Sequence, residues 1–397
     1  MNKAKGWHRD TALIRSGINR TGYQETSEAL FMTSGYVYET AEEAAVAFKG
    51  KTDNFVYSRF GNPTLWALED RLAQLEGAEA CRVCSTGMAA IFASMACQLS
   101  AGDRVVASRA LFGACHSILT KILPRWGVEV ELVDGRDLNA WKVALSQPAK
   151  LVFFETPSNP VLHLVDIEAV SLLAHAAGAK VIVDNVFATP LFQSPLALGA
   201  DIVVYSTTKH IDGQGRLLGG AVLGKTDFIE EVFLPFYRQT GAAMSAFNAW
   251  VMLKSLETLA LRVEMQTRTA TLLVETIKQH STLETVSYPG DPAHPQYALA
   301  SRQMSGASTL IAFEVKGGRK GAFQFLNALK LIDISNNIGD SKSLACHPAS
   351  TTHMNLSEDE RLMLEISEGH VRLSVGLEHA DDLAADILQA LDICRDG

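Results

Sequence analysis

The chain has 397 residues, of which 47% are hydrophobic and 20% are charged. This length exceeds one ordinary hydrophobic core, so we expect a globular protein with two or three domains. The 35 Lys and Arg residues against 44 Asp and Glu residues give a net charge of −9, which argues against nucleic acid or an anionic membrane as the main partner.

The start of the chain and its cysteines bear on the compartment. Residues 1–17 carry charges and no apolar stretch, so they do not resemble a secretory signal. No apolar run approaches the length needed to span a bilayer. The six cysteines are scattered and do not form a disulfide framework, so we expect a cytoplasmic protein.

The first half of the chain changes character near residue 63. Residues 1–62 have no clear period and many turn residues, so we expect an arm that packs on something else, such as another subunit. From there on, helical and strand-like patterns alternate. Leucines recur at helical spacing from Leu65 to Leu75, and Gly77 is expected to end that helix.

Short runs rich in Val and Ile follow and are predicted strands. Amphipathic pieces, such as residues 166–179, separate most of them and are predicted helices. This alternation is typical of a largely parallel sheet with helices on both faces. The expected strands are RVVAS (104–108), VEVELV (128–133), KLVFFE (150–155), KVIVD (180–184), DIVVYS (201–206) and GAVLG (220–224).

The pattern changes again near residue 243. Residues 245–279 contain few helix breakers and predict a long helical stretch that leads out of the first domain. The remainder mixes strand patterns, such as TLIAFEV (309–315), with helical ones, which is typical of a smaller α+β domain. We therefore predict an α/β chain with an N-terminal arm (1–62), a large domain (63–255) and a small C-terminal domain (256–397).

Two of the predicted strands end in chemically reactive residues. KVIVD ends at Asp184, and DIVVYS leads directly into Ser206, Thr208 and Lys209. Ligands of open α/β sheets bind beyond the carboxyl ends of the strands, so we expect Asp184 and Lys209 at the same rim. A lysine that forms a Schiff base and an acid that keeps a pyridine nitrogen protonated are what pyridoxal phosphate (PLP) requires.

Other residues of the same region suit a phosphate group. Ser206 and Thr208 lie on one short turn and can donate hydroxyl hydrogen bonds. Residues 85–88 open a predicted helix, whose N-terminus offers free N–H groups and a partial positive charge. Gly87 would let the phosphate approach the backbone closely. Each motif is weak alone, and their order along the chain favours a PLP site.

Different site types fit the residues less well. Cys81 and Cys84 form a C-x-x-C without a second ligand pair, and we interpret them as small apolar strand residues. His347 and His353 fall in a predicted polar loop without metal-spaced partners, so we predict no metal site. A non-enzymatic ligand-binding module would need a glycine-rich fingerprint that is absent, whereas a cofactor-free lyase that uses only Lys209 remains an alternative.

Seven ordered motifs resemble the Cys/Met-metabolism family of PLP enzymes, over residues from about Thr11 to Asp392. The resemblance implies the aspartate-aminotransferase-type fold (fold type I), PLP as cofactor, small amino-acid substrates and a homotetramer built from two dimers. The motifs are YSRFGNPT (57–64), STGMAA (85–90), ETPSNP (155–160), VIVDNVFATP (181–190), YSTTKH (205–210), LGGAVLG (218–224) and VRLSVGLE (371–378).

The resemblance implies a role for each matching residue. Lys209 binds PLP covalently and then moves protons, and Asp184 pairs with the pyridinium nitrogen. Tyr57 and Arg59 reach the phosphate of a neighbouring subunit, and Arg372 holds the substrate α-carboxylate through a bidentate pair. The other implied cofactor ligands are Gly87, Met88, Phe112, Asn159, Ser206 and Thr208, and Asn159 and Ser343 are implied to help bind the substrate.

One position departs from the family pattern. Most members place a Tyr over the cofactor ring, and this chain has Phe112. Phe keeps the stacking surface and lacks the hydroxyl. We therefore expect Tyr57 and Lys209 to carry the acid–base catalysis.

Segments 111–127, 240–262 and 336–353 most resemble the bacterial O-succinylhomoserine sulfhydrylases. That resemblance implies γ-replacement, in which sulfide displaces the γ-succinyloxy group to give homocysteine for methionine biosynthesis. Ala114 stands where methionine γ-lyases often have Cys, which disfavours a methionine or cystathionine γ-lyase. Cystathionine γ-synthase, with cysteine as nucleophile, and O-acetylhomoserine sulfhydrylase are the nearer alternatives.

Overall fold

The computed structural model describes residues 7–395 and divides into two compact units. The first six residues of the predicted arm lie outside this range, and the expected domain limits at 62/63 and 255/256 remain predictions. The chain passes between the units at several points, one of which is between Thr208 and Lys209. Unit 1 comprises Met1–Gln98, Val204–Thr208 and Leu217–Thr258, and unit 2 comprises Leu99–Val203, Lys209–Arg216 and Leu259–Gly397.

In unit 1 the leucine repeat forms the predicted helix, α3 (Pro63–Glu76). The Asn62 side chain caps it by accepting the Thr64 N–H, and Gly77, at a φ of 77°, ends it. Strand β1 (Ala80–Cys84) contains Cys81 and Cys84, as predicted, and pairs antiparallel with β7. The other elements of unit 1 are α1 (Arg9–Arg15), α2 (Ala41–Phe48), α4 (Gly87–Ala96), β7 (Gly220–Gly224), a π-helix (Phe228–Phe233), α9 (Leu234–Thr240) and α10 (Ala246–Leu256).

Unit 2 begins with the parallel strands of the large sheet. Strand β2 (Arg104–Ser108) pairs parallel with β3 (Glu129–Val133) and β4 (Leu151–Glu155), and β4 pairs with β5 (Lys180–Asp184). All five residues of β4 are buried, as expected for a strand covered on both faces. The full strand order is β1-β7-β6-β5-β4-β2-β3, in which β6 is Ile202–Tyr205.

Helices connect these strands and close a core around Trp141 and Phe154, whose rings meet edge to face. The predicted helix at 166–179 is α7 (Ile167–Ala176), which begins after the capping residue Asp166. The mainly parallel sheet predicted from the sequence is confirmed. The remaining helical elements of this region are α5 (Gly113–Ser117), a π-helix (Ile118–Ile122), α6 (Leu138–Ala144), α8 (Thr189–Phe192) and 3-10 turns at Leu123–Trp126 and Pro195–Leu198.

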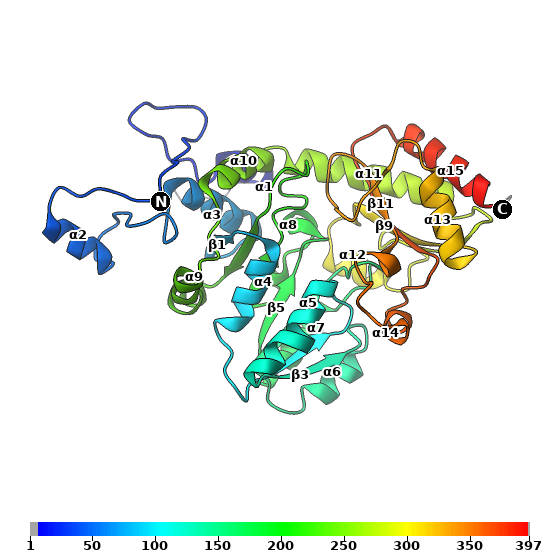
Figure 1. The fold of residues 1–397 in the computed structure, drawn as a ribbon, viewed down its shortest axis with the longest axis horizontal. Helices are drawn as coiled ribbons and strands as arrows, with labels where there is room; N and C mark the ends of the chain where they lie inside the picture. Colours follow the sequence, from blue (N-terminus) through cyan, green and yellow to red (C-terminus); the bar gives the residue numbers. More distant parts are fainter. Residues whose placement is uncertain (1–6, 396–397) are drawn as a thin grey trace. The chain divides into compact units, whose positions relative to one another are not determined.

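A second sheet of unit 2 has the strand order β10-β11-β12-β9-β8. Helices α11, α13 and α15 gather beside it, and their apolar side chains share a core with Phe313 of β9 (Figure 1). The elements are α11 (Leu259–Ile277), β8 (Leu283–Ser287), α12 (Tyr297–Gln303), β9 (Leu310–Val315), α13 (Gly318–Ala328), β10 (Asp333–Ile334), β11 (Leu344–Cys346), a 3-10 turn (Pro348–Ser350), α14 (Glu358–Met363), β12 (His370–Ser374) and α15 (Ala380–Arg395).

Three expectations need correction. The arm contains the short helices α1 and α2, which are too brief to show a period. The helical stretch predicted at 245–279 is two helices, because α10 ends at Leu256 and Thr258 bonds back to the Ser255 carbonyl before α11 begins. No Gly or Pro marks that break.

The polar loop predicted around His347 and His353 is the third correction, because both imidazoles are buried. His347 Nε2 lies 2.9 Å from the Glu368 carbonyl, and Nδ1 lies 2.8 Å from Ser350 Oγ.

Of the helices in residues 7–395, none is long and apolar enough to cross a membrane.

Candidate active site

Gly87 and Ser206 lie against one another in unit 1. Helix α4 begins at Gly87, and Thr86 Oγ1 caps it by accepting the Ala89 N–H at 3.0 Å. A Cβ atom on Gly87 would lie 2.6 Å from Ser206 Cβ and 2.8 Å from its Oγ, distances that no real Cβ tolerates. The glycine therefore permits this close approach, and the helix start offers the free N–H groups of the first turn, including that of Met88, to an anion.

Thr208, the other predicted phosphate ligand, is hydrogen-bonded within unit 1. Its hydroxyl donates to the Gly219 carbonyl at 3.2 Å and accepts the Gly219 N–H at 3.0 Å. A hydroxyl has one proton to donate, so donation to a phosphate requires this group to turn away from the carbonyl. The Oγ1 of Thr207 is buried and has no hydrogen-bond partner among the described residues.

Tyr57 and Arg59 form a separate group in unit 1. Tyr57 is 42% exposed. The Arg59 guanidinium lies 5.4 Å from the centre of the Tyr57 ring and 4.7 Å from that of Phe60, and it donates to the Arg238 carbonyl. A hollow of about 400 Å³ opens beside them, lined also by Asn62 and residues 243–246.

Lys209 is half-buried in unit 2. Its Nζ donates to Asn337 Oδ1 at 2.6 Å. Burial, and then the nearby Arg372 charge, lower the pKa of the Lys209 amine to about 8. A lysine of this pKa is partly neutral near physiological pH, and the neutral amine is the form that attacks a carbonyl carbon and takes up protons.

Asp184 ends strand β5 and is buried beside a second carboxylate. Its register partner in β4 is Glu155, and Asp184 Oδ1 accepts the Val186 N–H at 3.1 Å. Burial raises the pKa of Asp184 to about 7. Two buried acids side by side favour a cation near them, and a protonated pyridine nitrogen would supply that charge.

Arg372 lies on β12 and is 2% exposed. Its Nη1 donates to Asn159 Oδ1 at 2.8 Å and its Nη2 to the Asn336 carbonyl at 2.9 Å. Arg372 Nε is buried and has no hydrogen-bond partner among the described residues. This leaves donor capacity for a substrate carboxylate, and it places two predicted substrate ligands, Arg372 and Asn159, in direct contact.

The hydrogen bonds of Ser343 are made with residues other than Arg372 and Asn159. Its hydroxyl donates to Glu378 Oε2 at 2.8 Å and accepts the Gly376 N–H at 2.8 Å. Its own N–H donates to Glu378 Oε1. The side chain thus holds the chain around β11 and β12 together, and its predicted part in substrate binding rests on the resemblance alone.

Two residues of the site region are absent from the sequence-based prediction. Glu155 accepts the backbone N–H groups of Phe112 and Asn159. It ends a predicted strand, so the rule that selected Asp184 could also have selected it. Asn337, the Lys209 partner, follows β10 in a loop that carries no comparable signal.

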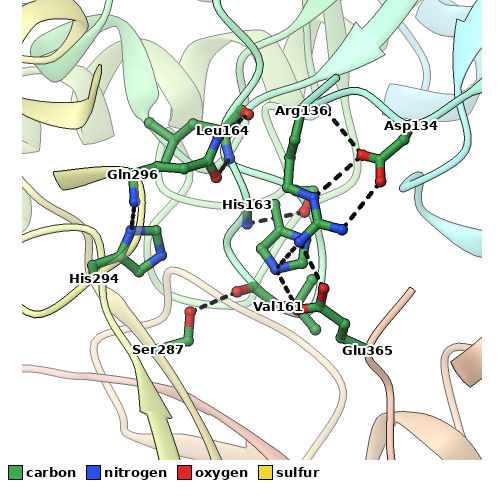
Figure 2. A network of polar contacts seen from close by, with 10 residues as sticks. Asp134, Arg136, Val161, His163, Leu164, Ser287, His294, Gln296 and Glu365 are labelled. Carbon is green, nitrogen blue, oxygen red and sulfur yellow. Dashed lines mark hydrogen bonds and ion pairs between the residues drawn. The ribbon is translucent and has the colours of Figure 1, made fainter. Parts of the chain in front are cut away.

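The loop that follows β4 and carries Asn159 is anchored beyond that residue (Figure 2). Ser287 Oγ donates to the Val161 carbonyl at 2.8 Å, and the Gln296 amide bonds both backbone groups of Leu164. His163 Nε2 lies 3.0 Å from a Glu365 oxygen. Arg136 joins the same cluster through Asp134 and Glu365.

Residues 10–392 match the model of the Cys/Met metabolism PLP-dependent enzyme family. The chain belongs to this family. It is therefore a PLP-dependent enzyme, as the motifs predicted, and the buried carboxylates, the lysine of lowered pKa and the glycine at the start of α4 fit such a cofactor.

Three relatives show how similar members of the family are named. The chain is 53% identical to an O-succinylhomoserine sulfhydrylase of Mycobacterium tuberculosis, over 96% of this chain and 95% of the relative. It is 45% identical to the enzyme of the same name from Pseudomonas aeruginosa, over 96% and 94%. An L-methionine gamma-lyase of Porphyromonas gingivalis is 42% identical over 96% of both chains.

Solved structures confirm the expected fold type I architecture. A cystathionine gamma synthase of Xanthomonas oryzae superposes with a TM-score of 0.93 at 32% identity, covering 98% of this chain and 99% of the other. A structure from Campylobacter jejuni, which contains N'-pyridoxyl-lysine-5'-monophosphate, has a TM-score of 0.94 at 31% identity, covering 97% and 100%.

Proposed function

We propose that this PLP-dependent enzyme catalyses γ-replacement and makes L-homocysteine from O-succinyl-L-homoserine and sulfide, a step of methionine biosynthesis. The observation that carries the proposal is the name shared by relatives at 53% and 45% identity, each aligned over 96% of this chain. The resemblance of segments 111–127, 240–262 and 336–353 to the same enzymes also supports it.

The side chains of unit 2 suit the amino-acid end of such a substrate. Arg372 binds the α-carboxylate with the donor that is free of protein partners, and Asn159 orients the guanidinium. Bound PLP supplies an electron sink for the carbanion that forms when the α-proton leaves. The Lys209 amine, with its pKa of about 8, takes up that proton and delivers protons at the neighbouring carbons.

At the γ-carbon the bond to the succinyloxy oxygen breaks and a bond to sulfur forms. The oxygen leaves with its electron pair as succinate, and hydrosulfide supplies the pair for the new bond, so no oxidant or reductant is needed. Phe112 places an aromatic ring without a hydroxyl at the position where most family members have Tyr. Tyr57 is the second acid–base group that we propose.

The remaining cofactor contacts of the proposal follow the family motifs. We propose that Gly87, Met88, Ser206 and Thr208 bind the phosphate, and that Asp184 pairs with the ring nitrogen, Asn159 contacts the ring oxygen and Phe112 stacks on the ring. Tyr57 and Arg59 serve the site of a neighbouring subunit in a homotetramer. The scattered cysteines support a cytoplasmic location.

A γ-lyase is the second candidate, because a relative named L-methionine gamma-lyase is 42% identical. Steady-state kinetics with O-succinyl- and O-acetyl-L-homoserine, each against sulfide and cysteine, separate the replacement reactions. 2-Oxobutanoate from L-methionine measures the lyase. The proposal expects the highest kcat/KM for the succinyl ester with sulfide. A higher kcat/KM for L-methionine breakdown would replace it with the lyase.

A further inference from the structure

The carboxylate of Glu155 joins three parts of unit 2. Oε2 accepts the Phe112 N–H at 3.0 Å, and Oε1 accepts the Asn159 N–H at 2.7 Å. The residue itself is 5% exposed and lies at the end of β4, in register with Asp184. One side chain thus fixes the backbone of both Phe112 and Asn159.

These contacts continue to the proposed substrate ligand. Asn159 accepts the Arg372 Nη1–H on its side-chain oxygen at 2.8 Å, while its N–H is held by Glu155. A shift of the Asn159 backbone would therefore move the acceptor that orients the Arg372 guanidinium. Phe112 directly precedes α5 as its N-cap residue, and its N–H is bonded to the second Glu155 oxygen at the end of β4.

The charge of the buried carboxylate matters as well as its shape. An ionised carboxylate is acceptor-only and can satisfy two N–H donors, one on each oxygen. Burial, and then the Asp184 charge, raise the pKa of Glu155 above its ordinary value, whereas the two N–H donors and the Arg372 charge oppose this rise. PLP would provide an additional cation beside Asp184, at its ring nitrogen. This charge would stabilise the ionised forms of both Glu155 and Asp184.

We propose that Glu155 is a positioning residue, which aligns Asn159 and through it Arg372 for the amino-acid substrate, and which sets the ring of Phe112 at the cofactor. The proposal rests on the proposed roles of Asn159, Arg372 and Phe112. It makes Glu155 a determinant of amino-acid affinity, although the residue itself touches neither substrate nor cofactor.

Glu155→Gln is the direct test. An amide has one acceptor oxygen, so either the Phe112 or the Asn159 N–H then faces an NH₂ group. The contacts of Val161, His163 and Leu164 keep the rest of the loop in place (Figure 2). We expect the dissociation constant of L-methionine, read from the absorbance of the bound cofactor, to rise about tenfold. The KM of the homoserine ester should rise similarly and kcat should change little.

Asp386→Asn is the matched control. Asp386 is also buried, and both of its oxygens accept backbone N–H groups, from Lys330, Leu331 and Ile332 at 2.8 to 3.0 Å. The Asp386→Asn variant should be less stable than the wild type but should bind L-methionine with the same dissociation constant. An unchanged constant in Glu155→Gln, or an equal rise in both variants, overturns the proposal.

Two further measurements keep the outcome clear. If Glu155→Gln does not fold, Glu155→Asp replaces it, because a carboxylate one methylene shorter cannot reach both N–H groups, and the same rise is expected. The dissociation constant of L-methionine can be measured whether or not the enzyme forms homocysteine. If the wild type binds L-methionine and forms no homocysteine, the proposed function fails while the comparison of Glu155 variants still stands.

Discussion

Gly87→Ala tests whether the start of α4 and Ser206 together bind the cofactor phosphate. The added methyl carbon would lie 2.6 Å from Ser206 Cβ, 2.8 Å from Oγ and 2.9 Å from Cα. Carbon atoms in contact are about 3.5–4.0 Å apart. The helix start and the Ser206 turn must therefore separate by about 1 Å, because backbone as well as side-chain atoms oppose the methyl group.

Overpacking of this kind costs about 1–3 kcal/mol. If the strain is relieved by separation of the two segments proposed to bind the phosphate, a similar free energy is lost from cofactor binding. A loss of about 2 kcal/mol corresponds to about a 30-fold higher dissociation constant for PLP. Titration of the apoenzyme with PLP, followed by cofactor absorbance, measures this constant directly.

Gly22→Ala is the control, since a Cβ there meets no atom within 4 Å and the backbone is not in the left-handed region. It should bind PLP as the wild type does. A dissociation constant for Gly87→Ala within twofold of the control would refute the assignment of this close approach to phosphate binding.

The remaining predictions concern catalysis, assembly and pH. Phe112→Tyr should raise the ratio of 2-oxobutanoate to homocysteine at fixed sulfide, because a hydroxyl beside the γ-carbon favours protonation over sulfide attack; an unchanged ratio leaves Phe112 as a stacking surface only. Mixing inactive Arg59→Ala and Lys209→Ala subunits under exchange conditions should restore activity if sites are shared, and no recovery argues against shared sites. His353 is 1% exposed, and burial, then Arg372, lower its pKa to about 4. Between pH 6.5 and 4 the His353 imidazole therefore binds a proton more tightly in the unfolded chain than in the folded one. The free energy of unfolding falls by about 3 kcal/mol as pH falls through that window. In His353→Gln, Tm should fall less than in the wild type as the pH is lowered. If Tm falls equally in both proteins, other groups control the pH dependence of stability.

Regular features of the sheet could be read from the sequence. The run KVIVD is β5 from Lys180 to Asp184, and the leucine helix ends at Gly77 as expected. Strands and helices with strong periodicity are decided by local pattern, and a polar residue at a strand end is visible in one dimension. That is why Asp184 and Lys209 could be selected without a structure.

Contacts between distant segments were not predictable in the same way. The Lys209 amine meets Asn337, and Glu155 gathers N–H groups from two loops that are far apart in sequence. The break between α10 and α11 depends on hydrogen bonds of Thr258 to the preceding turn and carries no Gly or Pro. His353 is buried because of what surrounds it, which its own polar segment does not reveal.

The central claim is that Lys209 carries PLP in this enzyme. Borohydride reduction of the holoenzyme converts the Schiff base into a stable secondary amine, and mass spectrometry of the digested protein locates the modified lysine. The account predicts a pyridoxyl group on the peptide that contains Lys209, and none on that peptide in Lys209→Ala. Stoichiometric labelling of a different lysine in the wild-type protein would contradict it.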